Sequence, residues 1–331
     1  TYVSMGFFSF LITLVIIRDA GLLITFLVHK ASTLFASGDP ATSTNEPEDP
    51  GRRLMIMQSI NAAGVGISAG LTAYGIYEAR RRPAVNEIDI EIRDLPSGLE
   101  GFRIVQITDI HAGLTVKRDF VEKIVNMVND LKPDLVAFTG DMVDGSVTSL
   151  RNDVEPFSKL TAEHGVYFVT GNHEYYSGAE DWVKEANRLG MKVLMNEHEL
   201  VTAGNGKLLI SGVTDVSGGG FYESHRSDPV KAVAGAPPAD AKILLAHQPR
   251  SLYDALPLGF DLILTGHTHG GQFFPWNLAA SAGQPHLYGL HDHGGTRIYV
   301  SKGTGYWGPP VRLGSRSEIT VVTLRQSSSL A

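Results

Sequence analysis

IVQITDIH, residues 104–111, combines two features that recur throughout this chain. Ile104 to Thr108 is a mostly β-branched run, which is typical of a buried strand. Asp109 and His111 follow it and place polar side chains at the carboxyl end of that strand. Because ligands of α/β sheets gather at the carboxyl ends of strands, we expect Asp109 and His111 to lie at a functional edge.

The same arrangement occurs four more times along the chain. The further apolar runs are Leu135 to Thr139, Val166 to Thr170, Ile243 to Leu245 and Leu262 to Thr265. The polar segments that follow them are Gly140-Asp141, Gly171-Asn172-His173-Glu174, Ala246-His247 and Gly266-His267-Thr268-His269. Five strands that each bring Asp, Asn or His to one sheet edge predict a metal site there.

Composition restricts the chemistry of that site. The chain contains no cysteine, so disulfides and thiolate ligands are excluded, and a metal must be held by His, Asp, Asn or Glu. A net charge of -7 does not suggest a basic surface, and we expect no nucleic-acid partner.

One segment is long and apolar enough to cross a membrane. Leu54 to Tyr77 is 24 residues without a charge, and a spanning helix needs about 20. Small residues recur every fourth position at Ala62, Gly66 and Gly70, which lets transmembrane helices approach closely. A buried core helix or a removable signal segment would give a similar pattern. We expect a transmembrane helix at about 54–77.

A second apolar segment precedes it, at about residues 1–28. It is interrupted only by Arg18 and Asp19, which could mark two spans that meet or one helix that leaves the bilayer. We expect a membrane helix here, followed by a polar loop at about 37–51. The first residue is Thr1 and not Met, so we expect the N-terminus to be incomplete or processed.

From Ala84 onward the pattern becomes that of an α/β domain. Ile88, Ile90 and Ile92 alternate with acidic residues, which indicates a half-buried strand. Helices are expected at 119–131, 181–189 and 250–256, and later strands at 208–211, 298–301 and 319–324. We therefore divide the chain into a membrane region, 1–83, and a catalytic domain, 84–331.

The polar segments suit a pair of divalent cations. Two-metal hydrolases hold their ions about 3.5–4 Å apart and activate a bridging water, so a shared carboxylate is expected. Asp141 is the natural bridge because Gly140 permits a tight turn before it. Mixed oxygen and nitrogen ligands favour Mn, Fe, Zn or Ni over an all-oxygen Mg or Ca site.

The order of these motifs resembles that of the calcineurin-like metallophosphoesterases. Asp-x-His, Gly-Asp-x-x-Asp (residues 140–144), Gly-Asn-His-Glu, a single His and Gly-His-Thr-His follow one another between residues 104 and 269. The similarity extends through GTGYWGPPV, residues 303–311, to near residue 324. The whole chain resembles the bacterial membrane-associated branch, in which membrane helices precede the catalytic domain.

The resemblance implies a role for each motif residue. Asp109, His111 and His269 would bind one metal, whereas Asn172, His247 and His267 would bind the second. Asp141 would bridge both ions. His173 would face the phosphate and protonate the leaving group. The implied fold is a four-layer α/β/β/α sandwich with two mixed sheets, preceded by transmembrane helices.

Other polar and aromatic residues near the motifs have less defined roles. We expect Asp144 and Glu174 to orient the ligands through hydrogen bonds. Asp215 either supports the site in the same way or merely ends a strand. Two larger groups could line the pocket or could be ordinary solvated and packing residues. They are His286, His291 and His293, and the aromatic residues Phe273, Phe274, Trp276, Tyr306 and Trp307.

These features predict a membrane-anchored, binuclear metal-dependent phosphoesterase. Diesters are favoured over monoesters because no basic clamp for a dianionic phosphate is obvious, although Lys117, Arg118, Lys302 or Arg312 could form one. The resembled branch suggests a lipid-linked phosphate ester or pyrophosphate such as UDP-2,3-diacylglucosamine. Alternatives are a phosphodiesterase for cell-envelope polymers and a non-catalytic metal- or phosphate-binding sensor or scaffold.

The resemblance also suggests a location in the bacterial cytoplasmic membrane. Lys30, Arg52 and Arg53 on one side of the 54–77 segment oppose Arg80, Arg81 and Arg82 on the other, so the positive-inside rule does not orient it. Arg52-Arg53 before an apolar run resembles a twin-arginine export signal, and we therefore expect an extracytoplasmic catalytic domain.

Overall fold

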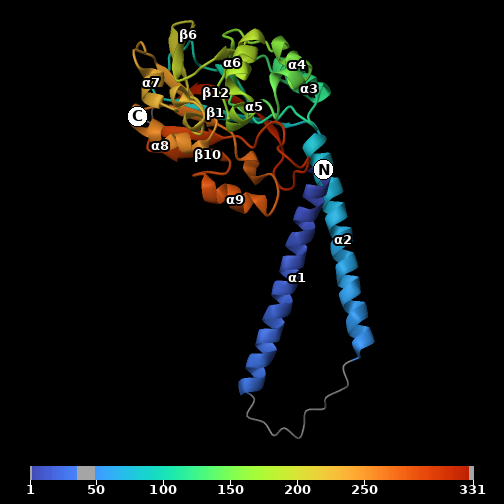
Figure 1. The fold of residues 1–331 in the computed structure, drawn as a ribbon. Coiled ribbons are helices and arrows are strands. Elements are labelled where there is room, and N and C mark those ends of the chain that lie inside the picture. Colours follow the sequence, from blue (N-terminus) through green and yellow to red (C-terminus); the bar gives the residue numbers. More distant parts are fainter. Residues whose placement is uncertain (1, 36–48, 328–331) are drawn as a thin grey trace. The chain divides into compact units, whose positions relative to one another are not determined.

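The computed structural model describes residues 2–35 and 49–327 and forms two compact units (Figure 1). One unit holds the residues up to Glu78 together with Pro309–Val311. The other runs from Ala79 to Gly308 and continues from Arg312.

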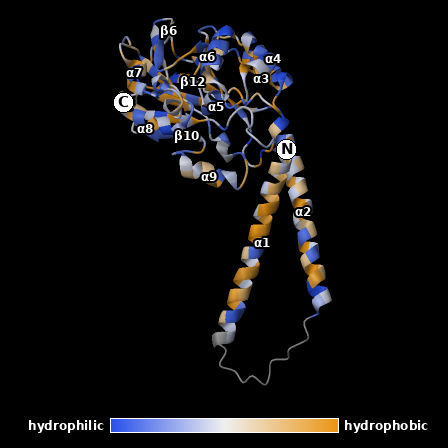
Figure 2. Cartoon of the chain, in the orientation of Figure 1, coloured by the Kyte–Doolittle hydropathy of each residue, from blue (hydrophilic) through white to orange (hydrophobic). Residues whose placement is uncertain are grey.

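The first unit contains two long apolar helices, α1 (Tyr2–Phe35) and α2 (Pro50–Arg80). At 1.5 Å per residue both exceed the roughly 30 Å of a bilayer's hydrocarbon core. By length and composition both could cross a membrane; Figure 2 shows hydrophobic colours along most of α1 and a mixture of hydrophobic and hydrophilic colours along α2. This confirms the expectation of two N-terminal apolar helices.

The helix limits differ from those expected from the sequence. α1 runs without a break through Arg18 and Asp19, so the two ions do not separate two spans. Arg18 instead forms an ion pair with Asp19 and donates a hydrogen bond to Asn61 of α2. The expected 54–77 helix lies inside α2. Of the expected polar loop, residues 37–48 lie outside the described residues, and Pro50 and Gly51 belong to α2.

The second unit is built around two mixed six-stranded sheets. The strand order of the first sheet is β1 (Ala84–Ile92), β12 (Glu318–Gln326), β2 (Arg103–Ile107), β3 (Leu135–Phe138), β4 (Val166–Phe168) and β5 (Lys192–Val193). Only the β12–β2 pair is antiparallel in this sheet.

The second sheet has parallel strands at its centre and an antiparallel strand at each edge. Its order is β10 (Gly289–His293), β11 (Thr296–Val300), β9 (Leu262–Thr265), β8 (Ala241–Leu245), β7 (Gly206–Gly212) and β6 (Glu197–Ala203).

Seven α-helices accompany the sheets within the described residues 79–327. They are α3 (Arg118–Asp130), α4 (Val147–Val154), α5 (Asn172–Ser177), α6 (Ala179–Arg188), α7 (Pro229–Val233), α8 (Leu252–Ala255) and α9 (Trp276–Gly283). In α3 the buried residues Phe120, Ile124 and Val128 recur every fourth position, so one face of the helix is apolar. This periodicity explains why the helix expected at 119–131 is found within one residue of those limits.

The hydrophobic clusters define four layers. One cluster lies between the sheets and includes Ile104 from the first and Ile243 from the second. A second joins α3 and α6 to the outer face of the first sheet, and a third joins α7 and α8 to the second sheet. Figure 1 shows these two groups of helices on different sides of the strands. The predicted α/β/β/α arrangement with two mixed sheets is confirmed.

A buried glutamine links the two sheets beside the carboxyl ends of β2, β3 and β9. Gln106 of β2 donates from Nε2 to Thr139 Oγ1 at 2.8 Å and to the Thr265 carbonyl at 3.0 Å. The strand expected at 104–108 packs against the second sheet, so the amide of Gln106 is buried and needs hydrogen-bond partners between the sheets. The link brings the ends of strands from both sheets together.

Candidate metal centre

The backbone is strained at many of the predicted ligands. Positive φ angles occur at nine non-glycine residues among those described, and such angles are uncommon for residues with a Cβ atom. Five of the nine belong to the predicted ligand set: Asp109, His111, Asp141, His267 and His269. Strain of this kind persists only where the surrounding structure enforces it, and it collects at functional sites.

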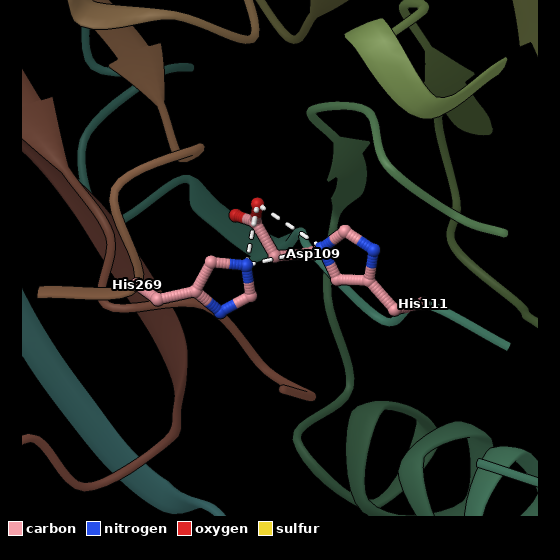
Figure 3. Close-up of side chains that lie close together, drawn as sticks. All are labelled: Asp109, His111 and His269. Carbon is pink, nitrogen blue, oxygen red and sulfur yellow. Dashed lines mark hydrogen bonds and ion pairs between the residues drawn. The ribbon is translucent and has the colours of Figure 1, made fainter. Parts of the chain in front are cut away.

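Asp109, His111 and His269 form one buried cluster (Figure 3). The Nε2 atoms of His111 and His269 lie 3.0 Å apart. Asp109 Oδ1 is 3.4 Å from His269 Nε2 and 3.9 Å from His111 Nε2. The strand ends of β2 and β9 therefore bring three potential ligand atoms to one point.

Asp141, His247 and His267 form a second cluster. His247 Nε2 lies 3.0 Å from Asp141 Oδ2 and 3.2 Å from His267 Nδ1. Asp141 Oδ2 is also 3.7 Å from His111 Nε2 of the first cluster. The Asp141 carboxylate thus lies between the two clusters, where a shared ligand would have to be.

Two observations show that these donors fit divalent cations. A metal–nitrogen distance of about 2.0–2.1 Å places two nitrogens of one ion about 2.9–3.4 Å apart, which matches both close imidazole pairs. The buried Oδ1 atom of Asn172 has no hydrogen-bond partner among the described residues. A buried amide oxygen without a partner is costly unless a ligand satisfies it.

Neighbouring groups set the protonation of two of the histidines. His111 Nδ1 lies 3.1 Å from Asp144 Oδ1, and His247 Nδ1 lies 2.8 Å from the Thr139 carbonyl. Both partners accept hydrogen bonds, so each Nδ1 donates outward and each Nε2 is the atom that faces the clusters. Burial acts to lower the pKa of His247, but Asp141 and Asp109 outweigh it and raise that pKa, so a metal at this position would replace a proton on Nε2. Burial and nearby His247 lower the pKa of His267 to about 3, which keeps that ring neutral.

Asp144 is shared by two imidazoles. Besides His111, its Oδ1 atom pairs with Nδ1 of His173, whose Nε2 lies 4.0 Å from Asp141 Oδ2. Burial acts to raise the pKa of Asp144, but His111 and His173 outweigh it and lower that pKa. Burial likewise acts to lower the pKa of His173, yet Asp144 and Asp141 raise it above its ordinary value.

Glu174 binds backbone N–H groups of the site and not the side chains of the ligands. Its carboxylate accepts hydrogen bonds from the backbone N–H groups of Asp141, Met142 and Gly171, at 2.7 to 3.0 Å. These bonds fasten the loop after β3 to the loop after β4. Burial and the Asp141 charge raise the pKa of Glu174 to about 8.

Arg312 contacts His269 of the first cluster and is not available to bind phosphate. It is fully buried, and its guanidinium donates to the carbonyls of His269, Lys302, Gly305 and Ser315. Its Nη2 atom is also 3.1 Å from His269 Nδ1. Two other candidate clamp residues form ion pairs of their own, Lys117 with Asp153 and Arg118 with Glu122.

Several supporting residues were not found by sequence reasoning. The runs of β2, β3, β4 and β9 each end in a fully buried threonine: Thr108, Thr139, Thr170 and Thr265. Thr108 Oγ1, for example, donates to Asp109 Oδ2 at 2.9 Å. A threonine directly before four of the five motifs is the signal that could have identified them. Gln248, which donates to buried Asp215, gave no such signal.

The three further histidines lie outside the two clusters. The rings of His286 and His291 stack at 3.7 Å, and His286 Nε2 is 2.7 Å from His293 Nε2. Among the aromatic residues, Phe273 and Tyr306 are buried, whereas Phe274, Trp276 and Trp307 are about half exposed. The Trp307 ring lies 5.9 Å from the His173 ring, beside the centre.

The family model for calcineurin-like phosphoesterases matches residues 102–271. The chain belongs to this family. It is 39% identical over 271 residues to a transmembrane protein with metallophosphoesterase domain from Danio rerio, covering 79% of this chain and 62% of that protein. It is 37% identical over 275 residues to an uncharacterized metallophosphoesterase from Helicobacter pylori, covering 80% and 70%.

The chain thus spans about three fifths of the length of the Danio rerio relative. Among solved structures, the NAD nucleotidase of Haemophilus influenzae aligns with a TM-score of 0.41 at 18% identity, over 62% of this chain and 45% of that one. Matches to animal and bacterial proteins show that the similarity is not confined to a bacterial branch.

Replacing Glu174 by Gln should loosen the site. The amide would turn an N–H donor toward a backbone N–H, so we expect a loss of about 1–3 kcal/mol in stability and about 10–100-fold in metal affinity. Thermal unfolding and calorimetric metal titration would measure both. Glu163→Gln, at an exposed position, is the matched control. Equal unfolding temperatures for the two variants would contradict the role given to Glu174.

Proposed function

We propose that this chain is a membrane-anchored, two-metal phosphoesterase that hydrolyses a phosphodiester or pyrophosphate. The observation that carries the proposal is the Asp141 carboxylate, which lies between two separate clusters of imidazoles. The unpaired oxygen of Asn172 and the two close imidazole pairs add support. Family membership supports the same reaction class.

The proposed ligand sets follow the clusters. Asp109, His111 and His269 would hold one cation, and Asn172, His247 and His267 the other, with Asp141 shared. When bound, two divalent cations would supply a nucleophilic water at neutral pH and offset charge on the phosphate. The nitrogen-rich donor set favours Mn, Fe, Zn or Ni.

His173 is the proposed proton donor to the leaving group. It lies next to Asp141 but its Nδ1 is bound to Asp144, so its Nε2 remains for a reacting oxygen. Because Asp144 and Asp141 raise its pKa, the imidazole retains its proton at higher pH than a free histidine would. A protonated imidazole near the leaving oxygen acts as a general acid.

An amphiphilic diester is the proposed substrate. Arg312, whose Nη2 lies 3.1 Å from His269 Nδ1, already has its donors bound to carbonyls, so it would not bind a second negative charge of a monoester. Half-exposed Trp307 and exposed Tyr176 flank His173, with ring centroids 5.9 and 5.1 Å away. These apolar groups suit a lipid-linked ester, for which UDP-2,3-diacylglucosamine is a test compound.

Metal dependence is the first prediction. We expect the full chain, purified in detergent and stripped with a chelator, to lose hydrolysis of bis-p-nitrophenyl phosphate and to regain it with Mn, Zn or Ni. Asp141→Asn should lower turnover at least about 10³-fold. Asp153→Asn, at a surface ion pair, is the matched control.

Calorimetry on the same samples separates the two classes of function. Two bound ions without turnover of this compound or of UDP-2,3-diacylglucosamine would contradict the enzyme proposal and favour a metal-binding sensor. Turnover that persists in Asp141→Asn would contradict the shared-ligand assignment.

The role of His173 predicts a dependence on the leaving group. For His173→Asn we expect turnover of a diester with an alkyl leaving group to fall about 10²–10⁴-fold, because a poor leaving group needs a proton. A p-nitrophenyl ester, whose leaving group needs little protonation, should lose much less. Wild-type activity on the alkyl ester should fall as pH rises through the raised His173 pKa, and this limb should vanish in the variant. An equal loss for both esters would argue against proton donation.

We further propose that α1 and α2 anchor the chain in a bacterial cytoplasmic membrane, with the catalytic domain on the extracytoplasmic side. Arg52 and Arg53 at the start of α2 support this orientation through their likeness to a twin-arginine signal. A C-terminal fusion to a reporter that is active only outside the cytoplasm should therefore be active. Signal from a fusion active only in the cytoplasm would reverse the orientation.

A further inference from the structure

An exposed surface segment beside the metal centre carries no formal charge. Residues 272–291 contain no Asp, Glu, Lys or Arg, although such residues make up 19% of the chain. Five of its apolar side chains are 42–60% exposed, whereas Phe273 is buried: the five are Phe274, Trp276, Leu278, Tyr288 and Leu290. We call these five side chains the uncharged surface. Trp276 and Leu278 lie in α9, which shows little hydrophilic colour in Figure 2, Phe274 and Tyr288 lie in the loops on either side of it, and Leu290 lies in β10.

This density of exposed apolar groups is unusual for a surface that faces water. Single exposed apolar residues need no explanation, but a contiguous group marks a binding surface. Three of the five side chains are aromatic, and Trp and Tyr are the residues enriched at membrane–water interfaces. Lys302 Nζ lies 5.0 Å from the centre of the Tyr288 ring, so a cation borders the surface.

The segment is fixed to the metal centre near both of its ends. Gln272, three residues after His269, exchanges hydrogen bonds with the backbone of Trp307 at 2.9 and 3.0 Å. Near the other end, the carbonyl of Leu287 accepts a 2.6 Å hydrogen bond from Thr268, between the two histidines of the motif. The uncharged surface therefore adjoins the residues that would process substrate.

The chain connection between the proposed span and the catalytic domain is short. α2 ends at Arg80 and β1 begins at Ala84, so three residues separate the proposed span from the first strand of the sheet. A chain of three residues reaches at most about 11 Å. Arg80, Arg81 and Arg82 at this point suit the anionic headgroups of a bilayer.

We propose that the uncharged surface binds the interfacial region of the lipid bilayer in which the chain is anchored. This inference rests on the proposed membrane anchoring. Aromatic and aliphatic side chains would enter the headgroup and upper acyl region, as in interfacial helices. The mouth of the metal centre would then meet the phosphoester of a lipid without the lipid having to leave the bilayer.

Three single-cysteine variants of the full chain test the proposal. The natural sequence has no cysteine, so each introduced thiol can be labelled uniquely with an environment-sensitive NBD dye. Leu278→Cys probes the uncharged surface. Val230→Cys on α7, 62% exposed against 60% for Leu278, is the matched control. Val65→Cys, in the apolar part of α2, reports on anchoring itself.

The labelled chains are reconstituted in nanodiscs of phosphatidylcholine and phosphatidylglycerol, with and without doxyl-labelled lipid. We expect the dye at 278 to emit at shorter wavelength than the dye at 230 and to lose most of its emission to doxyl lipid. The dye at 230 should be unaffected. Unchanged thermal unfolding of each labelled chain shows that the label has not disrupted the fold.

The outcomes separate this inference from the anchoring on which it rests. Quenching at 65 but not at 278 overturns the inference and leaves the anchor intact. Absence of quenching at 65 overturns the anchoring as well. A blue-shifted dye at 278 that doxyl lipid does not quench also overturns the inference, because protein and not lipid would then cover the surface.

Discussion

A carboxylate buried between two groups of imidazoles loses its hydration, and at Asp141 the protein must replace that stabilisation. His247 Nε2 lies 3.0 Å from Oδ2, and the His173 backbone N–H donates to Oδ1 at 2.9 Å. Burial acts to raise the pKa of Asp141, but His247, His173 and His111 outweigh it and hold that pKa well below its ordinary value. The surrounding loops serve to keep this one negative charge in place.

That requirement explains why so many polar groups occupy the edge where the sheets meet. Gln106 joins the first sheet to the carbonyl of Thr265 in the second. Glu174 ties two adjacent loops together through their backbone N–H groups, and Arg312 ties three more segments through carbonyls. Each group is buried and donates or accepts at least two hydrogen bonds here, so the ligands rest on a polar frame and not on apolar packing alone.

Site residues could be predicted from the sequence where each follows the same local pattern, an apolar run and then a polar residue. Asp109 and His267 follow apolar runs, so their place at strand ends could be predicted from the run and the polar residue alone. The burial of Arg312 could not be predicted, because its partners are backbone carbonyls. Every residue has a backbone carbonyl, so the sequence does not indicate which ones accept a hydrogen bond. The continuity of α1 through Arg18 was equally hidden, since its partner Asn61 is 43 residues away. Long-range partners decide these cases.

The order of strands in the first sheet has a consequence for biosynthesis. β12, the last strand, lies between β1 and β2, the first two of the catalytic domain. A nascent chain therefore emerges with a gap in the sheet, and β1 has no neighbour in it until residues 318–326 leave the ribosome. Co-translational folding from the N-terminus therefore cannot finish this domain until residues 318–326 have emerged. A prematurely terminated chain would display an open sheet edge to chaperones and proteases.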